Sequence, residues 1–305
     1  MLGGLKPLSC YLILKCLHFL DMHPMRPCRS YSYIFGVLIL LSAGITAAAP
    51  APQIFKVAIV PLMAPTVINR NWGPVLSSLE KATGHRFELS VYEQFSQFED
   101  EFKAGIPDFI YLNPFHAVMA RQAQGYIPLV RDGSELLSAI LVVLADSPIH
   151  QVSELNGKAI AFASPNAFAP LYLRALLTEK EKVTTRAVFV GSPQNAYRHV
   201  LTGDVEAGGG LLPLLQKEPA AVQARLKVLY TTPGVAPHPF AAHPRVPETI
   251  RRQIQQALLD MVRDPEGKKL LEMVLIKQPI IADFARDYAP LEQLHFERYM
   301  THSPN

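Results

Sequence analysis

Residues 159–179 read AIAFASPNAFAPLYLRALLTE, and this stretch decides the fold class. Its first five residues are a short apolar run, as in a buried strand. Ser164, Pro165 and Asn166 follow as turn and capping residues, and an apolar helical pattern begins with them. A buried strand, a polar turn and a helix in that order form the first half of a βαβ unit. The stretch therefore predicts an α/β protein in which helices cover a sheet.

The same unit recurs on both sides of this stretch. Short apolar runs predict strands at residues 54–60, 87–93, 108–112, 136–145, 159–163, 186–191, 205–210 and 226–232. Helical patterns lie between them at residues 73–84, 95–103, 115–125, 164–179 and 192–202, and polar-faced helices follow from residue 246. A loop is expected at 61–71, and the run at 226–232 is read as the last clear strand. The pattern restarts near Asp146, which indicates two α/β lobes joined by crossing strands.

The first 49 residues have the layout of a secretory signal peptide. Arg26 and Arg29 precede an apolar run, and the small residues at 47–49 follow it as a cleavage region. The run is shorter than the roughly 20 residues of a spanning helix, and no cysteine follows it that could carry a lipid. We therefore expect export to the periplasm without a lipid anchor, and Met25 is a second candidate start. The alternative is an uncleaved single-pass anchor.

Composition and charge exclude several classes of function. Hydrophobic residues make up 49% and charged residues 18%, which argues against disorder. The formal net charge is +3, but residues 50–305 carry equal numbers of basic and acidic side chains. A nucleic-acid binder or a membrane-surface binder would have a basic excess. The three cysteines all precede residue 29, so the rest of the chain has no disulfide, thiolate nucleophile or Cys-ligated metal.

Three loop-to-helix junctions carry the most specific signal for a site. They lie at residues 65–69, 113–116 and 164–168, and each follows a predicted strand and begins a helix. In open α/β sheets ligands bind beyond the carboxyl ends of the strands, where helix N-termini present free N–H groups and a positive dipole end. We therefore expect a crevice that suits an anion. The alternative is three well-capped helices without a ligand.

The histidines leave a second kind of site open. His238 and His243 lie in the proline-stiffened segment PHPFAAHP, and together with His116 or His199 they could ligate a metal. The alternatives are imidazoles hydrogen-bonded to the backbone in a structural role, or donors to an anion. An enzyme on the same scaffold has no motif in its favour, because the serine-hydrolase, zinc-protease and P-loop patterns are all missing.

The chain resembles the phosphate/phosphite/phosphonate-binding family of periplasmic proteins of ABC transporters. The resemblance covers nearly all of the mature chain and rests on SSLEKATG, DFIYLNPFHAV, ADSPIHQVSELNGKAIAFASPNAF, GSPQNAYRHVLTGDVEAGGG and VLYTTPGVAPHPFAAHPRVP. It implies a type II periplasmic-binding fold, with two α/β lobes, a ligand cleft and hinge crossovers. The first lobe would comprise residues 50–141 and 236–305, and the second residues 142–235.

The resemblance also implies a function. Phosphonate binders typically carry a Ser-Thr-Ser-Gly run where this chain has residues 164–169, which keep the N–H donors but lose most hydroxyls. The expected function is non-catalytic capture of a small oxyanion of the phosphonate, phosphite or sulfur-oxyanion type, without a cofactor or bound nucleic acid. The protein, expected to be a monomer, would serve an ABC permease or a membrane sensor kinase or cyclase. The expected ligand contacts are Thr66, Asn69, Tyr111, Asn113, His116, Ser164, Asn166, Ala167, Phe168, Tyr197 and His238.

Overall fold

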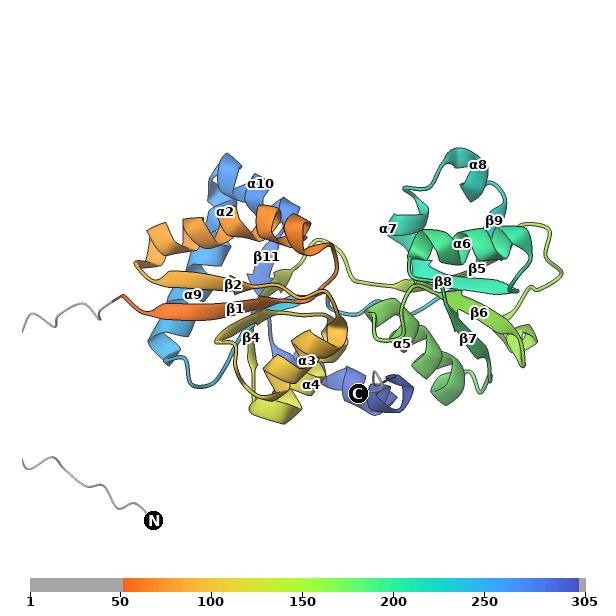
Figure 1. Cartoon of the computed structure of the whole chain (residues 1–305), viewed down its shortest axis with the longest axis horizontal. Coiled ribbons are helices and arrows are strands. Elements are labelled where there is room, and N and C mark those ends of the chain that lie inside the picture. Colours follow the sequence, from red (N-terminus) through yellow and green to blue (C-terminus); the bar gives the residue numbers. More distant parts are fainter. Residues whose placement is uncertain (1–51, 302–305) are drawn as a thin grey trace, which may run out of the picture. The chain divides into compact units, whose positions relative to one another are not determined.

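The computed structural model describes residues 52–301, so the predicted signal region at 1–49 lies outside the described residues. Two separate sheets form the framework, and helices cover each of them (Figure 1). The first sheet has the strand order β11 (Pro279–Ile281), β4 (Ile127–Asp132), β10 (Pro239–Ala242), β3 (Phe109–Tyr111), β1 (Ile54–Ile59) and β2 (Arg86–Ser90). The second has the order β7 (Arg186–Phe189), β6 (Ala159–Phe162), β8 (Ala207–Leu211), β5 (Ala139–Leu144) and β9 (Leu226–Thr231).

The pairings among the predicted strands are parallel in the first sheet and mixed in the second, where β5 pairs antiparallel with both β8 and β9. Strand β1 pairs in parallel with β2 and β3, and β6 pairs in parallel with β7 and β8. Between the sheets the chain crosses twice, and the two crossing segments are joined by a bridge between Leu137 and Val235. The expected lobe boundary after residue 141 falls inside β5, whose six residues all belong to the second sheet. The predicted α/β architecture is confirmed.

The helices fall into groups that cover the two sheets. On the first sheet α2 (Pro65–Thr83) contacts α9 (Glu248–Asp260) and α10 (Pro265–Met273), whereas α3 (Phe95–Lys103) contacts α4 (Pro114–Gln124). On the second sheet lie α5 (Phe168–Ala175), which continues into the π-helical turn η2 (Leu176–Lys180), and α6 (Pro193–Thr202). The shorter helices are η1 (Val152–Leu155), α7 (Leu212–Leu215), α8 (Ala220–Gln223), η3 (Met261–Arg263), α11 (Phe284–Asp287), η4 (Ala289–Leu294) and η5 (Phe296–Tyr299). No helix among residues 52–301 is long and apolar enough to cross a membrane.

Helix α2 begins earlier than the sequence pattern predicted. The expected loop at 61–71 is wrong in its second half, because the helix starts at Pro65 and runs through Pro74. Its buried side chains Ile68, Trp72, Val75 and Leu79 recur at helical spacing and form one apolar face. Burial of that face outweighs the hydrogen bond that Pro74 cannot donate.

Three strands of the first sheet were missed, and β9 is not the last strand of the chain. The missed strands are β4, β10 and β11, of which β10 lies between β3 and β4 and pairs antiparallel with both. Strand β10 is only four residues long and begins at Pro239, inside the segment that had suggested a histidine site. Short length and flanking prolines hide a strand from periodicity analysis, although its central position in the sheet buries all four residues.

The glycines of β8 allow helices to pack closely on both faces of the second sheet. A Cβ on Gly209 would collide with Phe162 and lie 3.0 Å from Leu173 of α5. A Cβ on Gly208 would lie 3.0 Å from Val200 of α6, and one on Gly210 would collide with the Tyr197 hydroxyl. The run of three glycines is therefore required by packing, and no phosphate-binding loop is needed to account for it.

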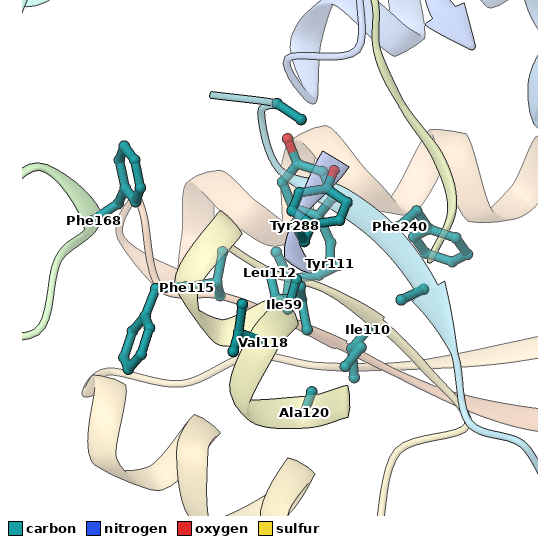
Figure 2. Close-up of a cluster of buried hydrophobic side chains, with 14 of the residues drawn as sticks. Ile59, Ile110, Tyr111, Leu112, Phe115, Val118, Ala120, Phe168, Phe240 and Tyr288 are labelled. Carbon is teal, nitrogen blue, oxygen red and sulfur yellow. The ribbon is translucent and has the colours of Figure 1, made fainter. Parts of the chain in front are cut away.

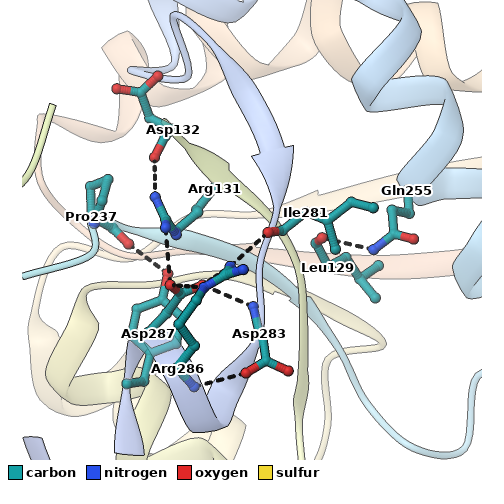
Figure 3. Close-up of polar contacts among 10 residues, drawn as sticks. Leu129, Arg131, Asp132, Pro237, Gln255, Ile281, Asp283, Arg286 and Asp287 are labelled. Carbon is teal, nitrogen blue, oxygen red and sulfur yellow. Dashed lines mark hydrogen bonds and ion pairs between the residues drawn. The ribbon is translucent and has the colours of Figure 1, made fainter. Parts of the chain in front are cut away.

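A polar cluster anchors the C-terminal helices to β4 (Figure 3). Arg131 Nη2 lies 2.9 Å from Asp287 Oδ1, and Arg286 Nη2 lies 2.7 Å from Asp287 Oδ2. The Asp283 amide also donates to Asp287 Oδ2, at 2.9 Å. Only 11% of the Arg131 side chain and 3% of the Asp287 side chain are exposed, so this ion pair is buried.

Candidate functional site

Asn113 stands between the end of β3 and the first turn of α4. Pro114 occupies the first helical position, and the Asn113 side chain is the N-cap that accepts from the His116 amide at 2.8 Å. The residue is fully buried, and its Nδ2 has no hydrogen-bond partner among the described residues. The predicted junction therefore exists, and it holds an unused amide donor at a helix N-terminus.

His116 turns towards α3. Its Nε2 lies 3.2 Å from Glu99 Oε1, whereas its Nδ1 is buried and has no partner within residues 52–301. The aromatic rings around the imidazole are those of Phe95, Phe98, Phe102 and Phe115. Burial lowers the pKa of His116 below its usual value, and the neighbouring Glu99 offsets only part of that shift. The imidazole is therefore neutral at physiological pH.

His238 lies just before β10 and stacks on Tyr111 of β3. The ring centroids are 5.7 Å apart with an interplanar angle of 24°. Burial and the nearby His116 imidazole lower the pKa of His238 to about 3, so this ring is also neutral. Its Nε2 is buried and unpartnered among the described residues. Figure 2 shows Tyr111 among the buried side chains at this end of β3. Tyr111, Asn113, His116 and His238 are thus brought together.

The predicted junction at residues 164–168, between β6 and α5, holds Ser164 and Asn166. Ser164 Oγ is buried and unpartnered within the described part of the chain. The Asn166 side chain is bonded to the backbone of Thr301, with Nδ2 donating to the carbonyl at 3.0 Å and Oδ1 accepting from the amide at 3.1 Å. Helix α5 begins at Phe168, so the N-cap is Ala167, which has no side-chain cap. Ser164 and Asn166 therefore belong to the turn and leave the first N–H groups of α5 uncapped by side chains.

A pocket of about 250 Å³ connects this turn with the first sheet's helices. It is lined by Gln94, Phe95, Ser96, Ser164, Pro165, Asn166 and Thr301. Phe95 also packs against His116, with the ring centroids 5.8 Å apart. One aromatic side chain thus lies between the pocket and the histidine cluster.

Three more of the predicted contacts are Thr66, Asn69 and Tyr197. Thr66 and Asn69 are exposed on the first turns of α2, and Asn69 Nδ2 donates to the Pro65 carbonyl of its own helix at 3.0 Å. Tyr197 packs in a smaller core cluster under α6, with its hydroxyl 3.4 Å from the Leu211 carbonyl, and burial raises its pKa to about 12. Among the described residues, none of these three side chains forms a hydrogen bond with Asn113, His116 or His238.

The metal alternative lacks a ligand set in the described part of the chain. No group of three or more His, Cys, Asp or Glu side chains within residues 52–301 is arranged to hold a metal ion. His199 Nδ1 lies 3.2 Å from Asp204 Oδ2, and His243 Nδ1 accepts from the Arg245 amide at 3.1 Å. These two histidines therefore have local partners of their own.

Glu99 and Thr301 were not among the contacts expected from the sequence. Glu99 lies on the apolar face of α3, four residues after Phe95 and three before Phe102, and it is 4% exposed. A carboxylate on an apolar helix face is a signal that could have identified a buried polar contact. Thr301 gave no signal, since its backbone alone contacts Asn166.

The paired contacts between Asn166 and Thr301 give a prediction about the C-terminal segment. Asn166→Ala removes both hydrogen bonds and should lower the free energy of unfolding by about 1–2 kcal/mol. Amide hydrogen exchange should show faster exchange at Thr301. Asn69→Ala, which removes a bond within one exposed turn, is the control and should leave that exchange unchanged. Equal exchange at Thr301 in both variants would contradict the assignment.

Two α/β lobes that the chain connects by two crossing segments, with polar groups at the strand ends, are the architecture of the type II periplasmic-binding-protein fold. The particular family follows from a family model described as "ABC transporter, phosphonate, periplasmic substrate-binding protein", which matches residues 57–288. The chain belongs to this family, and the resemblance noted in its sequence is confirmed. The family consists of substrate-binding proteins, which are not enzymes.

Solved structures show the same fold at low sequence identity. PhnD1 from Prochlorococcus marinus in complex with methylphosphonate is 17% identical, with a TM-score of 0.67, covering 81% of this chain and 98% of that one. XAC2383 from Xanthomonas citri bound to ATP is 16% identical, with a TM-score of 0.71, covering 81% and 99%. The aliphatic sulphonate binding protein SsuA from Escherichia coli is 15% identical, with a TM-score of 0.58, covering 81% and 92%. No curated protein sequence matches the chain.

Proposed function

We propose that this substrate-binding protein captures a small oxyanion between the N-termini of α4 and α5. One observation carries the proposal. Of the five buried side-chain polar atoms without a hydrogen-bond partner among residues 52–301, four belong to residues expected from sequence to contact the ligand. These four are Asn113 Nδ2, His116 Nδ1, Ser164 Oγ and His238 Nε2. Buried polar groups in folded proteins are nearly always paired, so these four unpaired atoms support a ligand that pairs them.

The local charges favour an anion over a cation. Helix N-termini carry a partial positive charge and free N–H groups, and both junctions present one. The Arg174 guanidinium adds a full positive charge near the junction at residues 164–168. Its Nη2 donates to the Pro165 carbonyl at 2.5 Å. The imidazoles contribute no charge, as burial keeps them neutral. An oxyanion can be held by such hydrogen bonds without a direct ion pair.

The proposed function includes a location for the protein and the partners that it serves. The protein would act in the periplasm after export by the N-terminal signal, as a monomer, without a cofactor and without catalysing a reaction. The bound oxyanion would be of the phosphonate, phosphite or sulfur-oxyanion type. Delivery to an ABC permease is the role that family membership supports. Presentation to a membrane sensor kinase or cyclase is the other role, and ligand uptake by cells that lack this protein would separate the two.

Thermal unfolding against a panel of anions tests the proposal. The panel contains phosphate, phosphite, methylphosphonate, methanesulfonate, sulfate and thiosulfate, each with chelator and with zinc. A ligand at about 100 times its dissociation constant should add roughly 2.7 kcal/mol to the free energy of unfolding. The midpoint should then rise by about 5–10 °C for a chain of this size, with or without chelator. A shift with zinc alone would support the histidine-ligated metal site instead. No shift with any anion would contradict the proposal.

A further inference from the structure

The Glu99–His116 pair fixes which ring nitrogen of His116 carries a proton. Glu99 is on α3, its side chain is 5% exposed, and its Oε1 lies 3.2 Å from His116 Nε2. A carboxylate only accepts hydrogen bonds, so the ring must donate from Nε2. Glu99 Oε2 has a separate contact, with Lys103 Nζ at 3.6 Å on the same helix. In a neutral imidazole the other nitrogen, Nδ1, is then an acceptor.

The side chains around Glu99 and His116 leave the ring proton of His116 on Nε2. Four phenylalanine rings enclose the imidazole, and the titratable neighbours on the other packed elements are His238 and Tyr111. His238 is neutral and Tyr111 keeps its proton, since burial raises the pKa of that phenol. His116 Nδ1 therefore remains a buried, unpartnered acceptor, and the Asn113 side chain that caps the His116 amide carries the unpartnered donor Nδ2.

We infer that His116 Nδ1, held as an acceptor by Glu99, selects oxyanions that carry a proton. The inference rests on the proposed function and narrows its substrate class. A hydrogen-bearing oxyanion, such as a phosphonate, phosphite or phosphate monoanion, donates its O–H to Nδ1 and accepts from Asn113 Nδ2. A sulfonate or sulfate has no proton to donate, so its oxygen would face the Nδ1 lone pair. Glu99 acts as a positioning residue, because it acts through the imidazole.

Methylphosphonate and methanesulfonate make a matched pair of probes, because both are tetrahedral and carry one methyl group. Their dissociation constants are measured by calorimetry at about pH 6, near the second ionisation of a phosphate-type group. We expect methylphosphonate to bind at least about tenfold more tightly, since an unsatisfied buried acceptor is costly. Equal or tighter binding of methanesulfonate to the wild-type protein would overturn the inference, whereas binding of neither anion would overturn the proposed function itself.

The Glu99→Gln variant tests the mechanism of selection. A glutamine amide can donate to Nε2, which would move the ring proton to Nδ1 and turn the acceptor into a donor. The ratio of the two dissociation constants should then fall to about one or below. Lys103→Met removes the neighbouring charge but keeps the carboxylate, and it should preserve the wild-type ratio. A Glu99→Gln ratio equal to that of the wild type would overturn the inference.

Nitrogen NMR of the imidazoles gives a readout that needs no ligand. The wild-type spectrum should show His116 protonated at Nε2, and the Glu99→Gln spectrum should show a population protonated at Nδ1. A purely structural role for Glu99 would change the stability without changing the tautomer. A wild-type His116 protonated at Nδ1 would overturn the inference, whatever the binding data show.

Discussion

Asn113→Asp should weaken anion binding by about a hundredfold or more at pH 7, while the protein stays folded. The aspartate keeps a cap oxygen for the His116 amide, but it replaces the unpaired Nδ2 donor with a carboxylate oxygen. An anion that meets this oxygen loses a hydrogen bond and gains a like charge in a buried site, and each effect costs on the order of 1–3 kcal/mol. Calorimetric titration with the anion identified by thermal unfolding measures the loss.

Two further variants separate this effect from general charge and from misfolding. Asn156→Asp adds the same charge at an exposed residue whose Oδ1 already accepts from the Thr184 amide at 3.0 Å, and it should bind the anion as the wild type does. Asn113→Ser keeps a capping oxygen, deletes the amide donor and adds no charge, so its affinity should fall between the two. Wild-type affinity in Asn113→Asp would remove Asn113 from the site.

Asp287→Asn should lower the free energy of unfolding by about 3 kcal/mol at pH 7. The substitution leaves the Arg131 guanidinium buried without its counter-ion (Figure 3). Removing one partner of a buried ion pair is much more costly than breaking an exposed pair. For a chain of this size the midpoint should fall by about 6–12 °C in a thermal scan. The control is Asp260→Asn, whose exposed pair with Arg263 should contribute less than about 1 kcal/mol.

The same substitution has an expected pH dependence. Burial alone would raise the pKa of Asp287, but hydrogen bonds from Arg286 and Arg131 outweigh it and hold that pKa well below its usual range. A carboxyl whose pKa is lowered by folding stabilises the folded state above its unfolded pKa, which lies near 3.9. The stability difference between wild type and Asp287→Asn should therefore be constant near neutral pH and shrink below about pH 4. A constant difference down to pH 2 would contradict the assignment.

The sequence by itself determined the α/β class and the first half of each βαβ unit. An apolar run as short as residues 159–163 favours a buried strand over a helix, and the amphipathic stretches between such runs have the period of helices that cover a sheet. Proline at the first turn of α4 and the cap at Asn113 were equally readable, because helix capping depends on residues three or four apart. These features depend on interactions between residues that are close in the sequence, so they could be predicted without knowledge of the tertiary contacts.

Tertiary structure alone decided the course of the first sheet and the chemistry of the site. Strand β10 is too short and too rich in proline to form without β3 and β4 on either side of it. Tyr197 was expected to contact the ligand, but it lies on the buried face of α6. There it packs in the core cluster that includes Ile140 and Ala161 of the second sheet. Glu99 and His116 are seventeen residues apart in the sequence and lie on different helices, α3 and α4. Only the packing of these helices makes one imidazole nitrogen a donor and the other an acceptor. Periodicity reports which face of an element is buried, whereas the tertiary fold decides which polar atoms on that face find partners.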